Sequence, residues 1–253
     1  MPDDHSTATP LSTVVVIMAM AEEARPLIEA LSFQPVPGVF APLPMRAYDA
    51  RLKRLHVRLV LNGEDPVYGV QNIGTQPATL AAQAAIQVFR PDLLMNAGTA
   101  GGFASRGAEI GTVYLSTGFK YHDRRIPLPG GYENYGIGNY PAAEAPALAR
   151  ALSLPTGIVS TGNSLELIER DQQMLERNGA VAKEMEAAAI AWVADLHGVP
   201  FLALKSITNL LDSARASEAQ FLENLDRAVA SLTRTLLEAL RFLDGKSLED
   251  LKR

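Results

Sequence analysis

Short apolar runs alternate with longer, helix-compatible stretches along most of this chain. Several runs are apolar throughout, as in strands covered on both faces, so we predict strands at residues 14–19, 55–61, 93–96, 112–116, 157–160, 181–183 and 201–207. Apolar residues at helical spacing predict helices at residues 22–31, 77–89, 144–152, 167–178, 185–197 and 217–243. This alternation predicts an α/β fold with a largely parallel or mixed sheet and helices on both sides.

No internal repeat or linker divides the chain. Its 253 residues, 47% of them hydrophobic, are enough to bury a substantial core in one α/β domain. We therefore expect a flexible tail at residues 1–12 and a single domain at residues 13–253. Residues 127–141 are rich in Gly, Pro and Tyr and predict one long surface loop.

Charge and cysteine content exclude several classes of function. The net charge is −5 and the basic residues are scattered, which argues against nucleic acid and anionic membrane partners. No apolar run approaches the roughly 18 residues of a membrane span, and the first residues lack a secretory signal pattern. The chain has no cysteine, so it has no disulfides, and we expect a cytoplasmic protein.

The usual cofactor motifs are not found. The four histidines lack metal-ligand spacing, so we expect no metal. The phosphate-binding loop of nucleoside triphosphatases and the dinucleotide fingerprint are both missing from the sequence. The sequence therefore predicts no cofactor.

Polar residues follow the carboxyl ends of several predicted strands, where sheets of this kind bind ligands. Glu22 and Glu23 follow the first strand, and the glycine-rich segment at residues 96–102 follows the third, where glycines allow positive φ or close approach of a ligand. Glu184 and Glu186 are two residues apart and cannot share a helix face, so we expect one to enter a site and the other to be solvated. Each feature alone also has a structural explanation, such as a charge at a helix start or a tight turn.

Six short segments occur in a fixed order along the chain. They are Met20-Ala21-Glu22-Glu23-Ala24, Asn96-Ala97-Gly98-Thr99-Ala100-Gly101-Gly102-Phe103, His122-Asp123-Arg124-Arg125-Ile126-Pro127, Ser160-Thr161-Gly162-Asn163-Ser164-Leu165, Glu184-Met185-Glu186-Ala187-Ala188-Ala189 and Lys205-Ser206-Ile207-Thr208-Asn209-Leu210-Leu211-Asp212. They resemble segments of the 5′-methylthioadenosine nucleosidases, within the nucleoside phosphorylase superfamily, and most closely those of plant-type members. The resemblance extends from about residue 14 to residue 251.

The resemblance implies a fold and an activity. The fold is a three-layer α/β/α sandwich with a central mixed sheet, and the protein is a homodimer. The activity is hydrolysis of the N-glycosidic bond of methylthioadenosine to adenine and methylthioribose, a step of methionine salvage. The plant-type pattern suggests a preference for methylthioadenosine, and acceptance of S-adenosylhomocysteine depends on the 127–141 loop.

The resemblance also implies roles for individual residues. Glu23 would activate the attacking water, which Thr99 and Lys205 would help to hold. Glu186 would accept hydrogen bonds from the ribose hydroxyls, with Met185 packed under the sugar. The remaining substrate-binding positions are those of the adenine edge and base (Ala100, Gly101, Leu165), those of the partner subunit's 5′-alkylthio pocket (Ile126, Leu128, Tyr135), and three others within the matched segments (Ser164, Glu184, Thr208).

Two positions depart from the family's pattern. Asn163 stands where plant-type members usually have Asp, at a position that varies. Asn209 stands where the family has the Asp that protonates N7 of adenine as the glycosidic bond breaks. An amide can donate a hydrogen bond to N7 but cannot transfer a proton, and general acid catalysis is typically worth about 10²–10⁴ in rate. We therefore expect binding with slow turnover.

Three interpretations of Asn209 remain open. The substitution is engineered to trap a substrate complex, or it retunes the pocket to a 6-oxopurine nucleoside, or the protein is a non-enzymatic nucleoside-binding or storage protein. An arginine cluster for phosphate is not evident in the sequence, which argues against a phosphorylase. Retention of both Glu23 and Glu186 argues against a storage protein.

Overall fold

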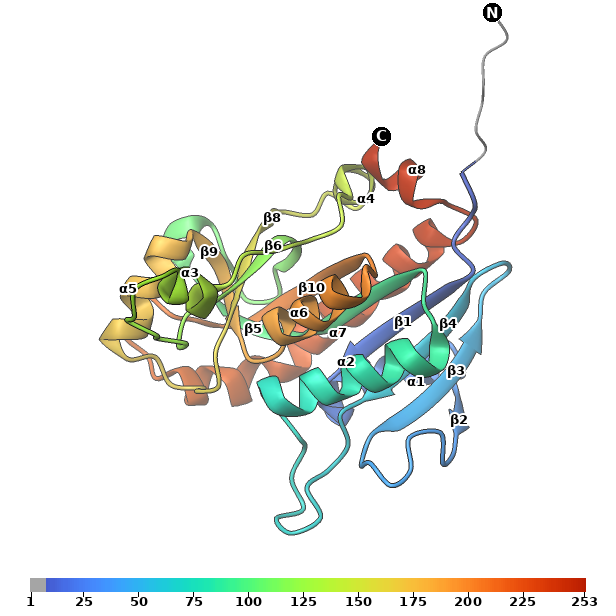
Figure 1. Ribbon diagram of the computed structural model, residues 1–253, viewed down its shortest axis with the longest axis horizontal. Coiled ribbons are helices and arrows are strands. Elements are labelled where there is room, and N and C mark those ends of the chain that lie inside the picture. Colours follow the sequence, from blue (N-terminus) through green and yellow to red (C-terminus); the bar gives the residue numbers. More distant parts are fainter. Residues whose placement is uncertain (1–7) are drawn as a thin grey trace, which may run out of the picture.

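The computed structural model describes residues 8–253. At its centre lies a ten-stranded mixed sheet (Figure 1). The strands are β1 (Thr13–Met18), β2 (Gln34–Val36), β3 (Arg46–Arg51), β4 (His56–Leu61), β5 (Leu93–Gly102), β6 (Val113–Tyr121), β7 (Tyr140–Pro141), β8 (Thr156–Thr161), β9 (Ala180–Glu184) and β10 (Phe201–Leu210). The helices are α1 (Ala21–Ala30), α2 (Thr75–Phe89), α3 (Tyr132–Ile137), α4 (Pro146–Ala151), α5 (Glu169–Asn178), α6 (Ala187–His197), α7 (Ser217–Leu243) and α8 (Leu248–Lys252), with one 3-10 turn, η1 (Ala104–Arg106).

The sheet branches at β5. Its strand order is β10-β6-β8-β9-β5-β1-β4-β3-β2, with β7 beside β6, and β5 also pairs with β10. Strands β1, β4, β5 and β10 run parallel to their neighbours in this set. The carboxyl ends of these four strands therefore lie along the same edge, where parallel sheets place ligands.

Helices cover both faces of the sheet. Side chains of α2 and α6 pack with Val15 and Ile17 of β1 in one core cluster. Side chains of α1 and α7 pack with Val14 and Val16 in the other cluster. Because successive residues of a strand point to opposite faces, β1 is apolar throughout and contributes to both clusters. The predicted α/β fold with a mixed sheet between helices is confirmed.

The glycine-rich segment at residues 96–102 was predicted as a loop after the third strand. In the structure it belongs to strand β5. Its glycines do not adopt positive φ. Small size is the reason for glycine here, since a Cβ at Gly101 would lie 2.8 Å from Leu211 Cδ2, and one at Gly102 would lie 2.9 Å from Ile207 Cδ1. Glycine thus allows β5 to pair with β10 and β9 at close range while it lines the site described below.

The prediction of one long loop at residues 127–141 is also wrong in part, because this segment contains α3 and the short strand β7. Strands β2 and β3 were not predicted, since they carry polar and charged residues at the edge of the sheet. Residues 1–7 of the predicted tail lie outside the described residues. Leu11 is buried and its N–H donates to the carbonyl of Lys246, so the fold begins before residue 12.

Candidate active site

A cavity of about 380 Å³ opens at the carboxyl ends of β1, β5 and β10. It brings together residues from four of the six matched segments and Leu165 of a fifth. The predicted site residues that line it are Glu23, Thr99, Ala100, Gly101, Leu165, Glu184, Met185, Glu186, Lys205, Thr208 and Asn209. The cavity therefore collects side chains that are almost 200 positions apart in the sequence.

Four predicted site residues do not line this cavity. Ser164 lies beside it, and its carbonyl accepts a hydrogen bond from Lys183. Ile126 lines a separate cleft, and Leu128 and Tyr135 are each 56% exposed. Within one chain, these last three side chains are not part of the pocket.

Sequence reasoning missed several lining residues. Val70, Gln71 and Ile73 come from the segment after β4, and Phe221 comes from α7. The rule that ligands collect after strand ends could have identified residues 70–73, because they follow a correctly predicted strand. Nothing in the sequence distinguishes Phe221 from the other apolar residues of its helix.

Glu23 is buried in the first turn of α1, while its neighbour Glu22 is exposed. Glu23 Oε1 accepts hydrogen bonds from the backbone N–H of Thr99, at 2.9 Å, and from the Thr99 hydroxyl, at 2.6 Å. Burial raises the pKa of Glu23 despite these donors and the nearby charge of Lys205. The other oxygen, Oε2, accepts no hydrogen bond from any residue that the structure describes, and it lies on the side of Gly98 and Lys205. Glu23 thus has one oxygen fixed and one available to a ligand or water.

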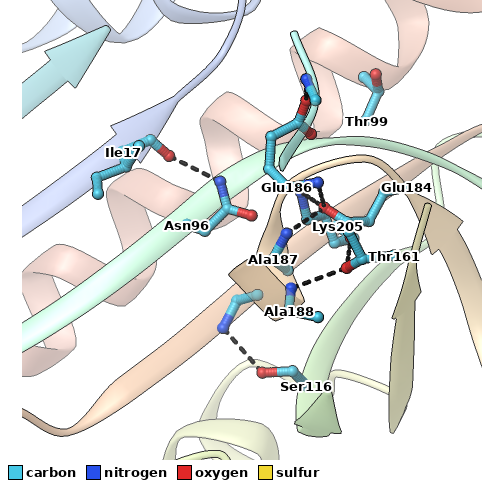
Figure 2. A network of polar contacts seen from close by, with 12 residues as sticks. Ile17, Asn96, Thr99, Ser116, Thr161, Glu184, Glu186, Ala187, Ala188 and Lys205 are labelled. Carbon is cyan, nitrogen blue, oxygen red and sulfur yellow. Dashed lines mark hydrogen bonds and ion pairs between the residues drawn. The ribbon is translucent and has the colours of Figure 1, made fainter. Parts of the chain in front are cut away.

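Glu184 is buried in the wall of the cavity, and other residues of the protein donate to both of its oxygens. Its carboxylate pairs with the Lys205 ammonium at 2.7 Å and accepts from the backbone N–H groups of Glu186 and Ala187 and from the hydroxyl of Thr161 (Figure 2). Burial alone would raise the pKa of Glu184, but Lys205 and these donors hold it below its ordinary value. The expectation that one of the two glutamates is solvated is wrong, because both are buried.

Glu186 is buried, and among residues 8–253 one group donates to its carboxylate. The backbone N–H of Gly74 donates to its Oε1 at 2.8 Å. Burial, together with the neighbouring negative charge of Glu184, raises the pKa of Glu186 to about 7. A ligand that donates further hydrogen bonds to this carboxylate would stabilise its ionised form.

Lys183 holds the segment that carries Leu165. Its ammonium donates to the carbonyls of Ser164 and Leu165 at 2.6 and 2.9 Å. Burial lowers the pKa of Lys183. The lysine therefore fixes two successive peptide groups at the wall of the cavity.

Asn209 lies at the end of β10, almost fully buried. Its Oδ1 accepts from the Thr208 hydroxyl at 3.0 Å. Nδ2 lies next to Gly101, 3.0 Å from where a Cβ of that glycine would be. The side chain thus presents an N–H donor along the Ala100–Gly101 wall of the cavity.

This arrangement suits a neutral ligand rich in hydroxyl groups more than it suits a metal. The cavity is lined by four carboxylates, Glu22, Glu23, Glu184 and Glu186, of which Glu184 is neutralised by Lys205. Among residues 8–253, no group of three or more His, Asp or Glu side chains is arranged to hold a metal ion. In the same part of the chain, no helix is long and apolar enough to cross a membrane.

Comparison with known proteins agrees with this geometry. Residues 13–241 match the family model of the phosphorylase superfamily. The chain is 40% identical over 246 residues to a 5′-methylthioadenosine/S-adenosylhomocysteine nucleosidase of Arabidopsis thaliana, an alignment that covers 96% of each protein. The apo structure of an Arabidopsis thaliana 5′-methylthioadenosine nucleosidase superposes with a TM-score of 0.94 at 38% identity, covering 96% of this chain and all of that one. A futalosine hydrolase of Helicobacter pylori shares the fold, with a TM-score of 0.77 at 20% identity over 91% of this chain and 98% of that one.

The fold, the carboxylate-lined cavity and these matches place the chain in the phosphorylase superfamily. Within that superfamily it belongs to the 5′-methylthioadenosine and S-adenosylhomocysteine nucleosidases.

Proposed function

We propose that this chain hydrolyses the N-glycosidic bond of 5′-methylthioadenosine, and more weakly that of S-adenosylhomocysteine, to adenine and a thioribose. The observation that carries this proposal is the pair of buried carboxylates, Glu23 and Glu186, in one cavity with the Lys205 ammonium, whose charge acts on both. The activities of the Arabidopsis relatives support it. We further propose that the reaction is slow, because Asn209 cannot act as a general acid.

The attacking water would bind to the free oxygen of Glu23. With Oε1 held by Thr99, Oε2 faces the cavity and can accept the proton of a water that attacks the anomeric carbon. The raised pKa of Glu23 makes the carboxylate a stronger base than an exposed glutamate. Lys205, fixed by Glu184, would keep the water close to this carboxylate.

Glu186 would accept hydrogen bonds from the ribose hydroxyls. These donors would replace the solvation that the buried carboxylate lacks and would favour its ionised form. The same negative charge stabilises the positive charge that develops on the ribose ring as the glycosidic bond breaks. Glu186 therefore binds the sugar more strongly in the transition state than in the ground state.

The leaving group would lie between Leu165 and Asn209. The backbone of Leu165, held by Lys183, would contact the adenine edge, and the Asn209 amide would donate to N7. Without a proton from residue 209, adenine leaves as an anion or takes its proton from elsewhere. This raises the barrier by roughly 3–5 kcal/mol, the equivalent of about 10²–10⁴ in rate.

The proposal includes a homodimer. Large apolar side chains are exposed on the neighbouring helices α2 (Leu80, Val88) and α6 (Trp192, Leu196), as expected of a surface that packs against another protein. Exposed Leu128 and Tyr135, with Ile126, would then extend into the partner's 5′-alkylthio pocket. Molar mass by light scattering tests this, and a monomer at micromolar concentration would contradict it. We also propose that the protein is cytoplasmic, on the basis of its cysteine-free sequence.

The activity is tested by adenine release from methylthioadenosine. The parent chain should release adenine slowly, and Asn209→Asp should accelerate release by about 10²–10⁴. Asn163→Asp is the matched control, because it makes the same chemical change outside the cavity while keeping the oxygen that accepts from the Thr75 N–H. Comparable rates in the parent chain and the Asn209→Asp variant would show that N7 is protonated from another source.

The Asn209 amide also favours a second candidate, a 6-oxopurine nucleosidase. Nδ2 can donate to O6 of such a base, which adenosine derivatives lack. This candidate predicts faster turnover of inosine than of methylthioadenosine by the parent chain. Equal inertness toward both nucleosides would exclude it.

A further inference from the structure

A second cleft, of about 310 Å³, lies outside the active site and is lined by four arginines. Arg124 and Arg125 come from the segment after β6, and Arg170 and Arg177 come from α5. Gln173 also lines the cleft, one helical turn from each α5 arginine. The sequence did not reveal this cluster, because its members are up to 53 positions apart and meet only in the fold.

The cleft is strongly positive although the chain as a whole carries a net charge of −5. Of the residues that the structure describes, Glu133 is the one acidic side chain that lines it, and it pairs with Arg177 at 2.8 Å. Arg125 pairs with Asp171, which is buried beneath the surface. Among residues 8–253, neither Arg124 nor Arg170 forms an ion pair. At least two guanidinium groups are therefore left without a counter-ion.

Other side chains hold Arg124 and Arg125, the two arginines from the segment after β6, in place. The Arg124 guanidinium lies 4.4 Å from the ring centroid of Tyr121 and 4.9 Å from that of Tyr135, so the two aromatic side chains stack against it. Arg125 is anchored by Asp171. Fixed guanidinium groups bind oxyanions with less loss of side-chain freedom than flexible ones, and their donors suit the oxygens of phosphate.

The spacing of the arginines indicates the size of the anion. Arg170 and Arg177 are seven residues apart on α5, about 10 Å along the helix axis. Two linked phosphates carry more charge and more acceptor oxygens than a single phosphate, so they can contact more of the four guanidinium groups at once. We infer that this arginine cleft binds a small molecule carrying a diphosphate group.

This site is separate from the nucleoside pocket and does not depend on the proposed activity. The two cavities have no lining residue in common. Asp123, next to Arg124, accepts from the Asn163 N–H at 2.6 Å, so the cleft adjoins the segment that carries Leu165 without entering the pocket. In the proposed homodimer, Ile126 would extend from this cleft into the partner's 5′-alkylthio pocket, so the cleft would adjoin that pocket at the subunit interface.

Calorimetric titration with inorganic pyrophosphate tests the inference, at a total ionic strength held constant with sodium chloride. The parent chain should bind pyrophosphate saturably, and more tightly than it binds inorganic phosphate. Arg170→Ala should weaken binding about tenfold or more, the typical loss for a charge-assisted contact. Arg177→Ala, a second variant on the same helix, should also weaken binding.

Arg234→Ala, which removes an exposed arginine from α7, is the matched control and should leave binding unchanged. A C-nucleoside analogue of methylthioadenosine should not compete, since it would occupy the other cavity. Three results would overturn the inference: no saturable binding by the parent chain, equal binding by Arg170→Ala, or competition by the nucleoside analogue. Failure of the nucleosidase assay would leave this test unaffected.

Discussion

Glu184 and Glu186 are two residues apart, both buried, and in opposite states. Glu184 accepts four hydrogen bonds or ion pairs from the protein, and the pKa of its carboxyl group is lowered. Glu186 accepts one, and its pKa is raised to about 7. The difference separates a carboxylate that organises the site from one that the protein leaves for a ligand. Burial alone would not distinguish them.

The largest expected effect comes from removing the saturated carboxylate. In Glu184→Gln, Lys205 loses its ion-pair partner inside the protein, and breaking such a buried pair typically costs about 3–5 kcal/mol. Glu186→Gln should cost little or increase stability at pH 8, because it removes an unsatisfied buried charge. Urea unfolding of both variants at pH 8 measures the difference. Equal losses of stability would mean that the two carboxylates are not distinct.

The pH dependence of stability sharpens the same contrast. Because the pKa of Glu186 rises from 4.5 to about 7 on folding, the folded protein keeps a proton that the unfolded chain has lost between these values. The contribution of Glu186 to stability should therefore fall by up to about 3 kcal/mol as pH rises from about 4.5 to about 7, and level off above. His122 acts in the opposite direction, because burial lowers its pKa to about 4, so its contribution to stability rises with pH up to about 6.5. The difference between the pH profiles of the parent chain and Glu186→Gln isolates the Glu186 contribution, and a difference that stays constant from pH 5 to 8 would contradict it.

A smaller effect is expected from the hydroxyl that supports Glu184. Thr161 donates to this carboxylate and accepts from the Ala188 N–H, so Thr161→Val should cost about 2 kcal/mol of unfolding free energy. Ser206→Ala is the matched control, since the buried Ser206 hydroxyl has no hydrogen-bond partner among the described residues. Thermal unfolding of the two variants should show a clear loss for the first and almost none for the second. A loss in both would point to packing rather than to the Glu184 network.

The sequence predicted the fold well where one physical signal dominates. Helix α7 was predicted with both ends correct, because its apolar residues recur at helical spacing over 27 residues. Strand β1 was predicted from its apolar run. Strands β2 and β3, the last two strands on one side of the sheet, were missed because their polar, partly exposed residues form no such run. The glycine-rich segment was assigned to a loop because glycine is depleted in strands and frequent in turns, and the close strand contacts that require it form only in the fold.

The site was predictable in outline, because polar residues after parallel strands meet at one edge of the sheet. The different states of Glu184 and Glu186 could not be predicted. They depend on contacts with Lys205 and Gly74, which come close to the two carboxylates only in the folded protein. The role of Lys183 was missed for a similar reason: its partners are carbonyl groups, which any residue can supply.

The central claim is that Glu186 is left unsatisfied so that ribose hydroxyls can donate to it. The most direct test is the number of protons released when a C-nucleoside analogue of methylthioadenosine binds at pH 7, measured by calorimetry in buffers of different ionisation enthalpy. With a pKa of about 7 in the free protein, Glu186 is about half protonated, and ribose donors would lower its pKa. The account predicts release of about half a proton, abolished in Glu186→Gln. Binding without proton release, or with the same release in the variant, would contradict it.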